Sequence, residues 1–176
     1  MILSKAEHAA AIDKAVFPGM QGGPIMSAIA AKAVALHECQ QSSYQSYAKQ
    51  VVVNAKALAS ALVSEGMRAI SGGTETHLAL IDVTGVGVTG KVADERCGAS
   101  GITLNKNSIP FDPNPPAVTS GIRVGTPAVT TQGMGVDQMK VIANLITRAI
   151  KSDDANEHAK IKSEVQSLVS KYPIYA

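Results

Sequence analysis

The spacing of apolar residues changes at about residue 66, and this change constrains the fold more than any other feature. Before it, apolar residues recur on one face of a helix that begins near Ser43: Val51, Ala55, Leu58 and Leu62. Gly66 is a natural stop for that helix. After it come two short β-type runs, MRAI (67–70) and HLALIDV (77–83), separated by the turn SGGTET. Residues 78–81 are apolar on both alternations, so we predict that the two runs are paired central strands.

The rest of the chain alternates strands and helices. A helix is predicted from Thr89, and ITLNKN (102–107) and SGIRVGTP (120–127) predict two further strands joined by a proline-rich connection. Two helices follow, over residues 136–150 and 153–171. This order predicts an α+β fold in which helices cover a small, largely antiparallel sheet.

The first forty residues contain no predicted strand. Residues 5–17 are rich in alanine and favour a short helix, and PGMQGGP (18–24) is a loop. A second helix is predicted over residues 24–41, with Pro24 at its first position, where a missing N–H costs nothing. Because this part has no sheet of its own, we expect residues 1–42 to be the end of something larger and residues 43–176 to form a separate domain.

Composition argues against several classes of partner. The 176 residues carry a net charge of +2, with four Tyr, two Phe and no Trp, so neither a surface for the phosphate backbone of a nucleic acid nor a base-stacking platform is indicated. No run approaches the roughly 20 apolar residues that span a bilayer, and MILSK is too short for a signal peptide core. Cys39, Cys97 and the four histidines show no metal-ligand spacing. We expect a cytoplasmic protein with no metal, nucleic-acid or membrane partner.

Arg123 is the foremost candidate for binding chemistry. It stands between Ile122 and Val124 in VTSGIRVGTPAVTT (118–131), where the other residues are small, apolar or hydroxylated. Arginine keeps its charge, so a half-buried one needs an anionic partner, and its planar guanidinium binds a carboxylate through two parallel hydrogen bonds. The partner is either a substrate carboxylate or a surface carboxylate such as Asp112, and the pattern does not decide between them.

Gly22 and Gly23 form a candidate anion site because they precede a predicted helix. Glycine lets the backbone come close to a phosphate, and the free N–H groups at a helix start favour negative charge. The alternative is an ordinary loop before a helix.

A polar cluster ends the predicted strand 102–107. Asn105, Asn107 and Ser108 could contact a polar ligand, although asparagine at a strand end commonly bonds its own backbone in a turn. We expect Lys106 to be solvated rather than to carry a Schiff base, since nothing around it predicts burial. His77, which opens a predicted strand, is either a polar cap on the core or a neighbour of a ligand.

The order of these segments resembles the C-terminal part of serine hydroxymethyltransferases, from Met1 to about Ile150. Seven segments carry the resemblance: AVFPGMQGGPIM, AKAVAL, NAKALA, SGGTETHLALIDV, TGKVAD, GITLNKNSIPFDP and TSGIRVGTPAVTT. The resemblance implies the small C-terminal domain of a fold-type I enzyme that uses pyridoxal 5'-phosphate (PLP). Residues 1–42 would then end the large PLP-binding domain and supply an interdomain helix. Enzymes of this family move a one-carbon unit between serine and tetrahydrofolate, release glycine, and are active as homodimers or pairs of dimers.

The resemblance also implies roles for individual residues. Arg123 would hold the substrate α-carboxylate, and Gly22 and Gly23 would help to bind the phosphate of a cofactor held by the neighbouring subunit. Phe17 and Asn107 would approach the folate. Another fold-type I enzyme, such as an aminotransferase, would share Arg123 but not the pair FPGMQGGP and NKNSIPFDP.

Other parts of the family pattern have no counterpart in these residues. They are the Thr-Thr-His-Lys-Thr segment with the cofactor lysine, the groups that contact the cofactor ring, and the acid and tyrosines near the hydroxymethyl group. NPPA (114–117) also replaces a stretch that usually resembles Ser-Pro-Phe. We therefore expect no catalytic residue here and no activity unless another chain supplies these groups. The alternative is a non-catalytic fragment or protein-interaction module that self-associates through the apolar helix around residues 25–36.

Overall fold

The computed structural model describes residues 2–174 and separates into two compact units that divide between Gln45 and Ser46. The assignment of residues 1–42 to a larger domain stays a prediction. Among the described residues, no helix has the combined length and apolar content that crossing a membrane requires.

The first unit consists of short helices without buried side chains. They are α1 (Ala6–Lys14), the irregular segment η1 (Ala15–Met20) and α2 (Met26–Cys39). Every described side chain before Ser46 is exposed or, at Ile12, partly exposed. The prediction that Pro24 occupies the first position of a helix is wrong, because α2 begins at Met26 and Pro24 lies in the preceding loop.

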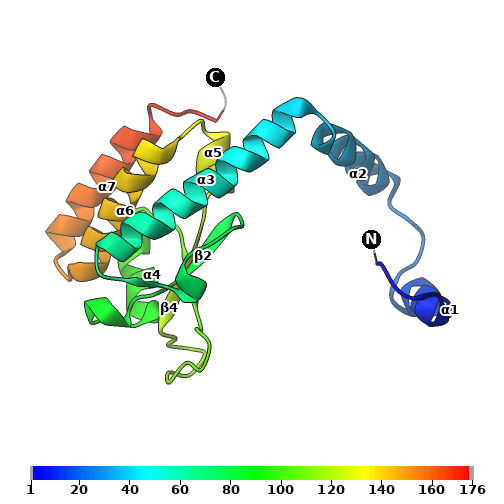
Figure 1. The fold of residues 1–176 in the computed structure, drawn as a ribbon, viewed down its shortest axis with the longest axis horizontal. Helices are drawn as coiled ribbons and strands as arrows, with labels where there is room; N and C mark the ends of the chain where they lie inside the picture. The colour runs from blue at the N-terminus through cyan, green and yellow to red at the C-terminus, as the bar shows by residue number, and fades with distance from the viewer. Residues whose placement is uncertain (1, 175–176) are drawn as a thin grey trace. The chain divides into compact units, whose positions relative to one another are not determined.

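The second unit is built on a four-stranded antiparallel sheet with the order β1-β2-β4-β3. Its two central strands, β2 and β4, are labelled in Figure 1. The strands are β1 (Arg68–Ala69), β2 (Leu78–Asp82), β3 (Asn105–Asn107) and β4 (Gly121–Gly125). The predicted antiparallel α+β class is confirmed. The prediction that the first two strands are both central is wrong for β1, which lies at an edge, because β4 pairs with the other side of β2.

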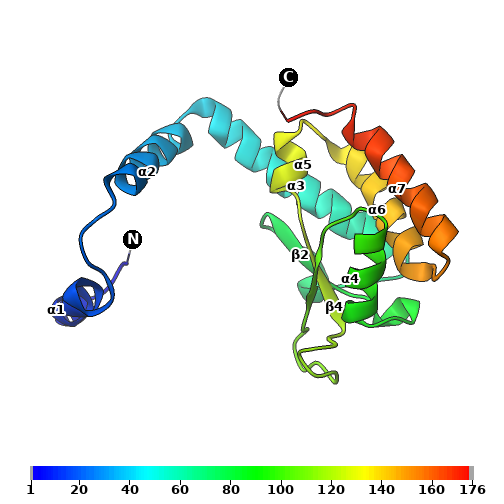
Figure 2. The ribbon, with the colours of Figure 1, turned by 180° about the vertical axis from the view of Figure 1, so that it is seen from behind.

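Helices cover one face of this sheet. The elements are α3 (Ser42–Ser64), α4 (Gly90–Ala99), α5 (Pro127–Thr131), α6 (Val136–Lys151) and α7 (Ala155–Val169), with the single turns η2 (Ile70–Gly72) and η3 (Thr84–Val86). Figures 1 and 2 show α6 and α7 side by side. The side chain of Thr89 caps α4 as predicted, accepting a hydrogen bond from the N–H of Val92 at 3.3 Å.

The register of the two central strands separates a core face from an open face. Ala79 is opposite Val124 and Ile81 is opposite Ile122, and all four side chains are buried. The alternate residues point to the other face, where Leu80 is partly exposed and lies opposite Arg123. The core face packs on the helices, whereas Arg123 and Asn105 on the open face are exposed.

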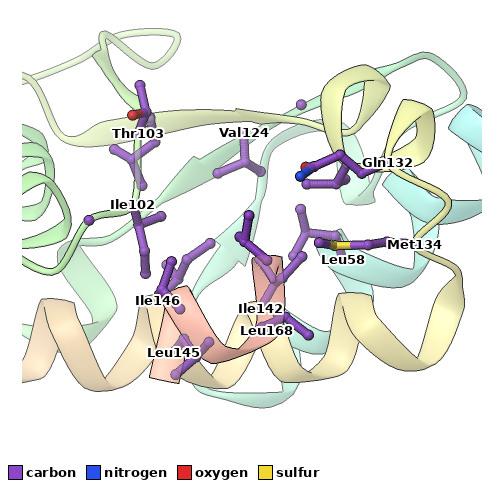
Figure 3. Close-up of a pocket in the computed structure, with 16 residues that line it drawn as sticks. Leu58, Ile102, Thr103, Val124, Gln132, Met134, Ile142, Leu145, Ile146 and Leu168 are labelled. Carbon is purple, nitrogen blue, oxygen red and sulfur yellow. The ribbon is translucent and has the colours of Figure 1, made fainter. Parts of the chain in front are cut away.

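The core behind the sheet also contains a small cavity (Figure 3). Its volume is about 200 Å³ and its lining is largely aliphatic, with side chains from α3, β4, α6 and α7 and from the segment 101–104. Ile102 and Ile146 approach it from different elements, and Gln132 adds one polar side chain.

The short helix α5, which the sequence analysis missed, is held by contacts with distant residues. The buried amide of Asn54 on α3 donates to Thr130 Oγ1 and to the carbonyl of Met134, both at 2.9 Å. Thr126 Oγ1 donates to the carbonyl of Val51 at 2.8 Å. These bonds satisfy polar groups that would otherwise be buried without partners.

Candidate functional site

Arg123 lies at the centre of the open face of the sheet. Its neighbours across the ladders are Leu80 on β2 and Asn105 on β3. The side chain is exposed, so the premise that this arginine is half-buried is wrong. Among residues 2–174 no hydrogen bond or ion pair reaches its guanidinium. The strand therefore presents a fixed cation with its donors available.

A shallow hollow of about 380 Å³ surrounds this guanidinium. It is lined by His77, Leu78, Thr103, Leu104, Asn105, Arg123 and Gly125. The lining combines one guanidinium, an imidazole, an amide and a hydroxyl with two leucines, a combination that suits a small polar anion. His77 is exposed, so its imidazole does not cap the core.

Asp112, the alternative partner of Arg123, is engaged elsewhere. Its Oδ1 accepts hydrogen bonds from the N–H of Asn114 (2.9 Å) and the hydroxyl of Ser120 (2.6 Å). Its Oδ2 accepts from the N–H groups of Ile109 (3.0 Å) and Ser120 (2.9 Å). Desolvation acts to raise the pKa of this carboxyl, but the bonds from Ser120, Asn114 and Ile109 outweigh it and lower the pKa to about 2. The sequence analysis missed this arrangement, although Asp-Pro-Asn is a typical turn signal.

Asp82, at the end of β2, is a buried carboxylate. It accepts bonds from the N–H and the hydroxyl of Thr84, at 2.9 and 2.7 Å, and from Arg68 at 2.7 Å. Desolvation opposes ionisation, but these bonds and the charge of Arg68 together lower the pKa of Asp82. Asp112 differs because no cation lies within ion-pair distance of it among the described residues.

Asn107 is near the site but does not line the hollow. It is partly buried, and its amide donates to the carbonyl of Ser108 at 2.7 Å, which is the turn arrangement named as the alternative. Asn105, two residues earlier on the same face of β3, lies directly opposite Arg123. Lys106 is exposed, as predicted.

The other predicted site residues, Phe17, Gly22 and Gly23, belong to the first unit. Phe17 is exposed and has extended backbone angles within η1. A methyl group added at Gly22 or Gly23 would meet no described atom within 4 Å, and neither residue has a positive φ. The local fold of this unit does not require glycine at either position, so the anion-site hypothesis depends on what the loop contacts.

Three other titratable groups of the second unit, Cys97, His158 and Arg148, are buried or bonded within the fold. Burial, with a contribution from Asp94, raises the pKa of the Cys97 thiol to about 12. His158 Nδ1 lies 2.8 Å from Ser100 Oγ, and Arg148 bonds Glu157 and Glu164. Within residues 2–174 no group of three or more His, Cys, Asp or Glu side chains is arranged to hold a metal.

Comparison with known proteins gives the same family as the seven sequence segments that resemble serine hydroxymethyltransferases. The family model for serine hydroxymethyltransferase matches residues 4–146. The chain belongs to the serine hydroxymethyltransferase family. It is 51% identical over 175 residues to a serine hydroxymethyltransferase of Coprothermobacter proteolyticus, covering 99% of this chain and 42% of that protein. It is 51% identical over 176 residues to one of Koribacter versatilis, covering 99% and 41%. The chain thus spans about two fifths of the length of these family members.

Proposed function

We propose that this chain is the C-terminal part of a serine hydroxymethyltransferase and that the longer protein interconverts serine and glycine while transferring a one-carbon unit to tetrahydrofolate. The observation that carries the proposal is Arg123, an exposed guanidinium free of described partners on the open face of the sheet. It lies in a chain half identical to serine hydroxymethyltransferases over nearly all of its length.

Arg123 binds the carboxylate of the amino acid. Its strand is hydrogen-bonded to β2 on one side and to β3 on the other, so the backbone beneath the guanidinium is held in place. A carboxylate can accept two parallel hydrogen bonds from it, which sets the orientation of the substrate as well as its affinity. Asn105 and His77, which line the same hollow, are placed to contact the remaining polar atoms.

The residues of this chain fit part of a PLP site. When bound, PLP supplies an electron sink for cleavage of bonds at the substrate α-carbon. The open backbone at Gly22 and Gly23 has room for a phosphate of a neighbouring subunit's cofactor. Every described lysine is exposed, whereas a lysine that carries such a cofactor is normally desolvated. We therefore assign cofactor attachment, and with it the catalytic groups, to the part of the longer protein outside this chain.

Phe17 and Asn107 contribute to the folate site in this proposal, and the complete enzyme is a cytoplasmic homodimer or pair of dimers. Phe17 offers an exposed aromatic ring, and Asn107 starts the connection between β3 and β4. Both assignments depend on the family resemblance together with the exposure of these elements.

The test is steady-state kinetics of the longer protein with Arg123→Ala. Loss of a charge-assisted bidentate contact should raise the KM for serine about 100-fold, which corresponds to about 2.7 kcal/mol, while PLP affinity stays within about threefold. Arg123→Lys keeps the positive charge but cannot form the two parallel hydrogen bonds of a guanidinium, so its KM for serine should lie between those of the parent and of Arg123→Ala. Lys162→Ala, which removes an exposed cation on α7, is the control and should leave the KM for serine unchanged. Equal weakening of serine and PLP would refute the assigned role.

A non-catalytic interaction module is the second candidate, favoured by the apolar side chains of α2. Ile25, Met26, Ile29, Val34 and Leu36 are all exposed. Isolated apolar surfaces of this kind favour self-association. Sedimentation of the 176-residue chain with and without Ile29→Glu and Leu36→Glu tests it. A concentration-dependent dimer that the charges abolish, together with PLP absorbance that serine does not change, would support the module for the chain alone.

A further inference from the structure

The segment 108–120 connects β3 to β4 and links two parts of the candidate site. It leaves β3 after Asn107 and enters β4 at Gly121, and these two residues are paired across the ladder. Arg123 follows two residues later. The β3–β4 ladder sets the register of Asn107 against the strand that carries Arg123, and the connection adds a second constraint at the end of that ladder.

The carboxylate of Asp112 holds both ends of this segment. It accepts from Ile109, two residues after β3 ends, and from the N–H and hydroxyl of Ser120, immediately before β4 begins. The fourth bond comes from the N–H of Asn114. Four donors therefore converge on two oxygen atoms, which is the full capacity of a strongly bonded carboxylate.

The same network continues into the sheet. Ser120 is fully buried, its hydroxyl accepts from the amide of Asn114 at 2.9 Å, and its carbonyl accepts from the N–H of Val83 at 3.1 Å. The packing beside it is close, since a Cβ at Gly121 would lie 2.7 Å from the Ile109 side chain and 2.9 Å from the Asn107 carbonyl. Asp112 thus connects the tip of the segment to the ends of three strands.

The tip of the segment points into solvent. Phe111, next to Asp112, is entirely exposed and has a φ of 57°. An aromatic residue in the left-handed region is unfavourable by itself, so neighbouring contacts must hold it there. A backbone hydrogen bond from the N–H of Asp112 to the carbonyl of Ile109, at 3.1 Å, closes the turn that contains Phe111, and the four bonds to the Asp112 carboxylate add to it.

We infer that Asp112 is a positioning residue for the folate side of the site: its carboxylate holds the segment 108–120, and through it the end of β3 at Asn107, in the conformation that receives tetrahydrofolate. This inference rests on the proposed function. Arg123 depends on it less, because ladders on both sides of β4 hold the arginine without the segment. Loss of the Asp112 carboxylate should therefore weaken the binding of tetrahydrofolate much more than the binding of serine.

The first test measures amide hydrogen exchange in the 176-residue chain with Asp112→Asn. The asparagine has the same shape, but its NH2 group cannot accept, so two of the four donors lose their partner. Exchange at the N–H groups of Ile109, Asn114 or Ser120 should accelerate about tenfold or more, with Ile81 and Ile122 unchanged. Unchanged exchange in the segment would overturn the inference.

The second test measures kinetics of the longer protein with Asp112→Asn and Asp112→Ala. The KM for tetrahydrofolate should rise about tenfold, with kcat and the KM for serine within about threefold. Asp137→Asn, an exposed carboxylate at the start of α6, is the matched control. An unchanged KM for tetrahydrofolate, or an equal rise in both KM values, would refute the positioning role. Absence of turnover in the unmodified protein would instead refute the proposed function and, with it, the link to folate.

Discussion

Residues 2–45 and residues 46–174 are both rich in helix, yet only the second region has a core. No described side chain of the first region is buried, although many are apolar. In the second region, amphipathic helices pack on the apolar face of a sheet, and this packing fully buries side chains such as Ile81, Ile122 and Ile150.

The difference shows that apolar composition does not by itself produce a core. Alanine-rich helices such as α2 form from local preferences, whereas burial needs a second apolar surface. The sheet supplies that surface for the second region.

The two cysteines should differ most. Cys39 in α2 is exposed, whereas Cys97 in α4 is buried and the pKa of its thiol is raised to about 12. Because only the thiolate reacts, and only when the site opens, Cys39 should react with a disulfide reagent at least about a thousandfold faster. Absorbance of the released thiol measures both rates. In urea, where the chain is unfolded, Cys39 and Cys97 should react at similar rates. Similar rates in the native chain would contradict the difference between the two regions.

Truncation of a core side chain should have the next largest effect. Ile81→Ala removes a fully buried side chain between the sheet and the helices and should lower the free energy of unfolding by about 3–4 kcal/mol. Ile29→Ala on α2 is the matched change in the first region and should cost less than about 0.5 kcal/mol. Urea unfolding followed by circular dichroism measures both. Equal losses would mean that Ile29 is buried in solution.

Removal of a buried polar side chain should cost less. Asn54→Ala leaves the Met134 carbonyl and Thr130 without their donor and should destabilise the second region by about 2 kcal/mol. Asn144→Ala, at an exposed position of α6, is the control and should stay within about 0.5 kcal/mol of the parent chain. If Asn54→Ala lowered the free energy of unfolding no more than Asn144→Ala does, the hydrogen bonds of Asn54 would not be what holds α5.

Acid should produce the smallest effect. The pKa of Asp112 is lowered from 3.8 to about 2, so its bonds stabilise the folded state above about pH 4, and this contribution disappears as the pH falls towards 2. The difference in unfolding midpoint between the parent chain and Asp112→Asn should therefore be constant from pH 7 to 4 and narrow below it. Asp13→Asn in α1 is the control from the first region. If the difference in unfolding midpoint between the parent chain and Asp112→Asn stayed the same at pH 2, the ionised form of Asp112 would not be the stabilising one.

Local signals predicted most of the helices. The apolar stripe from Val51 to Leu62 and the cap at Thr89 describe contacts within one or two turns, so the sequence contains all the information they need. Helix α5 was missed because it has only five residues and depends on Asn54 and Val51, which are far away in the chain. The edge position of β1 was missed for the same reason, since β4 takes the other side of β2 only in the folded chain.

The candidate site was predicted in its residue types more than in its geometry. Arg123 was identified by its unusual surroundings in the sequence, but its exposure and its neighbours Asn105 and His77 follow from the pairing of three strands. Asp112 was considered only as a partner for Arg123. Its four donors come from residues that the turn brings together, and a pattern of residue types does not specify which hydrogen bonds a turn will form.

The identity and spacing of residues along the chain were enough to indicate the α+β class, the family and most of the helices and strands. Folding was needed to establish which face of the sheet stays open, that Arg123 stands on it without a described partner, and that Asp112 joins the ends of β3 and β4. These features arise from contacts between residues that folding brings together, and their energies depend on burial and geometry that exist only in the folded chain.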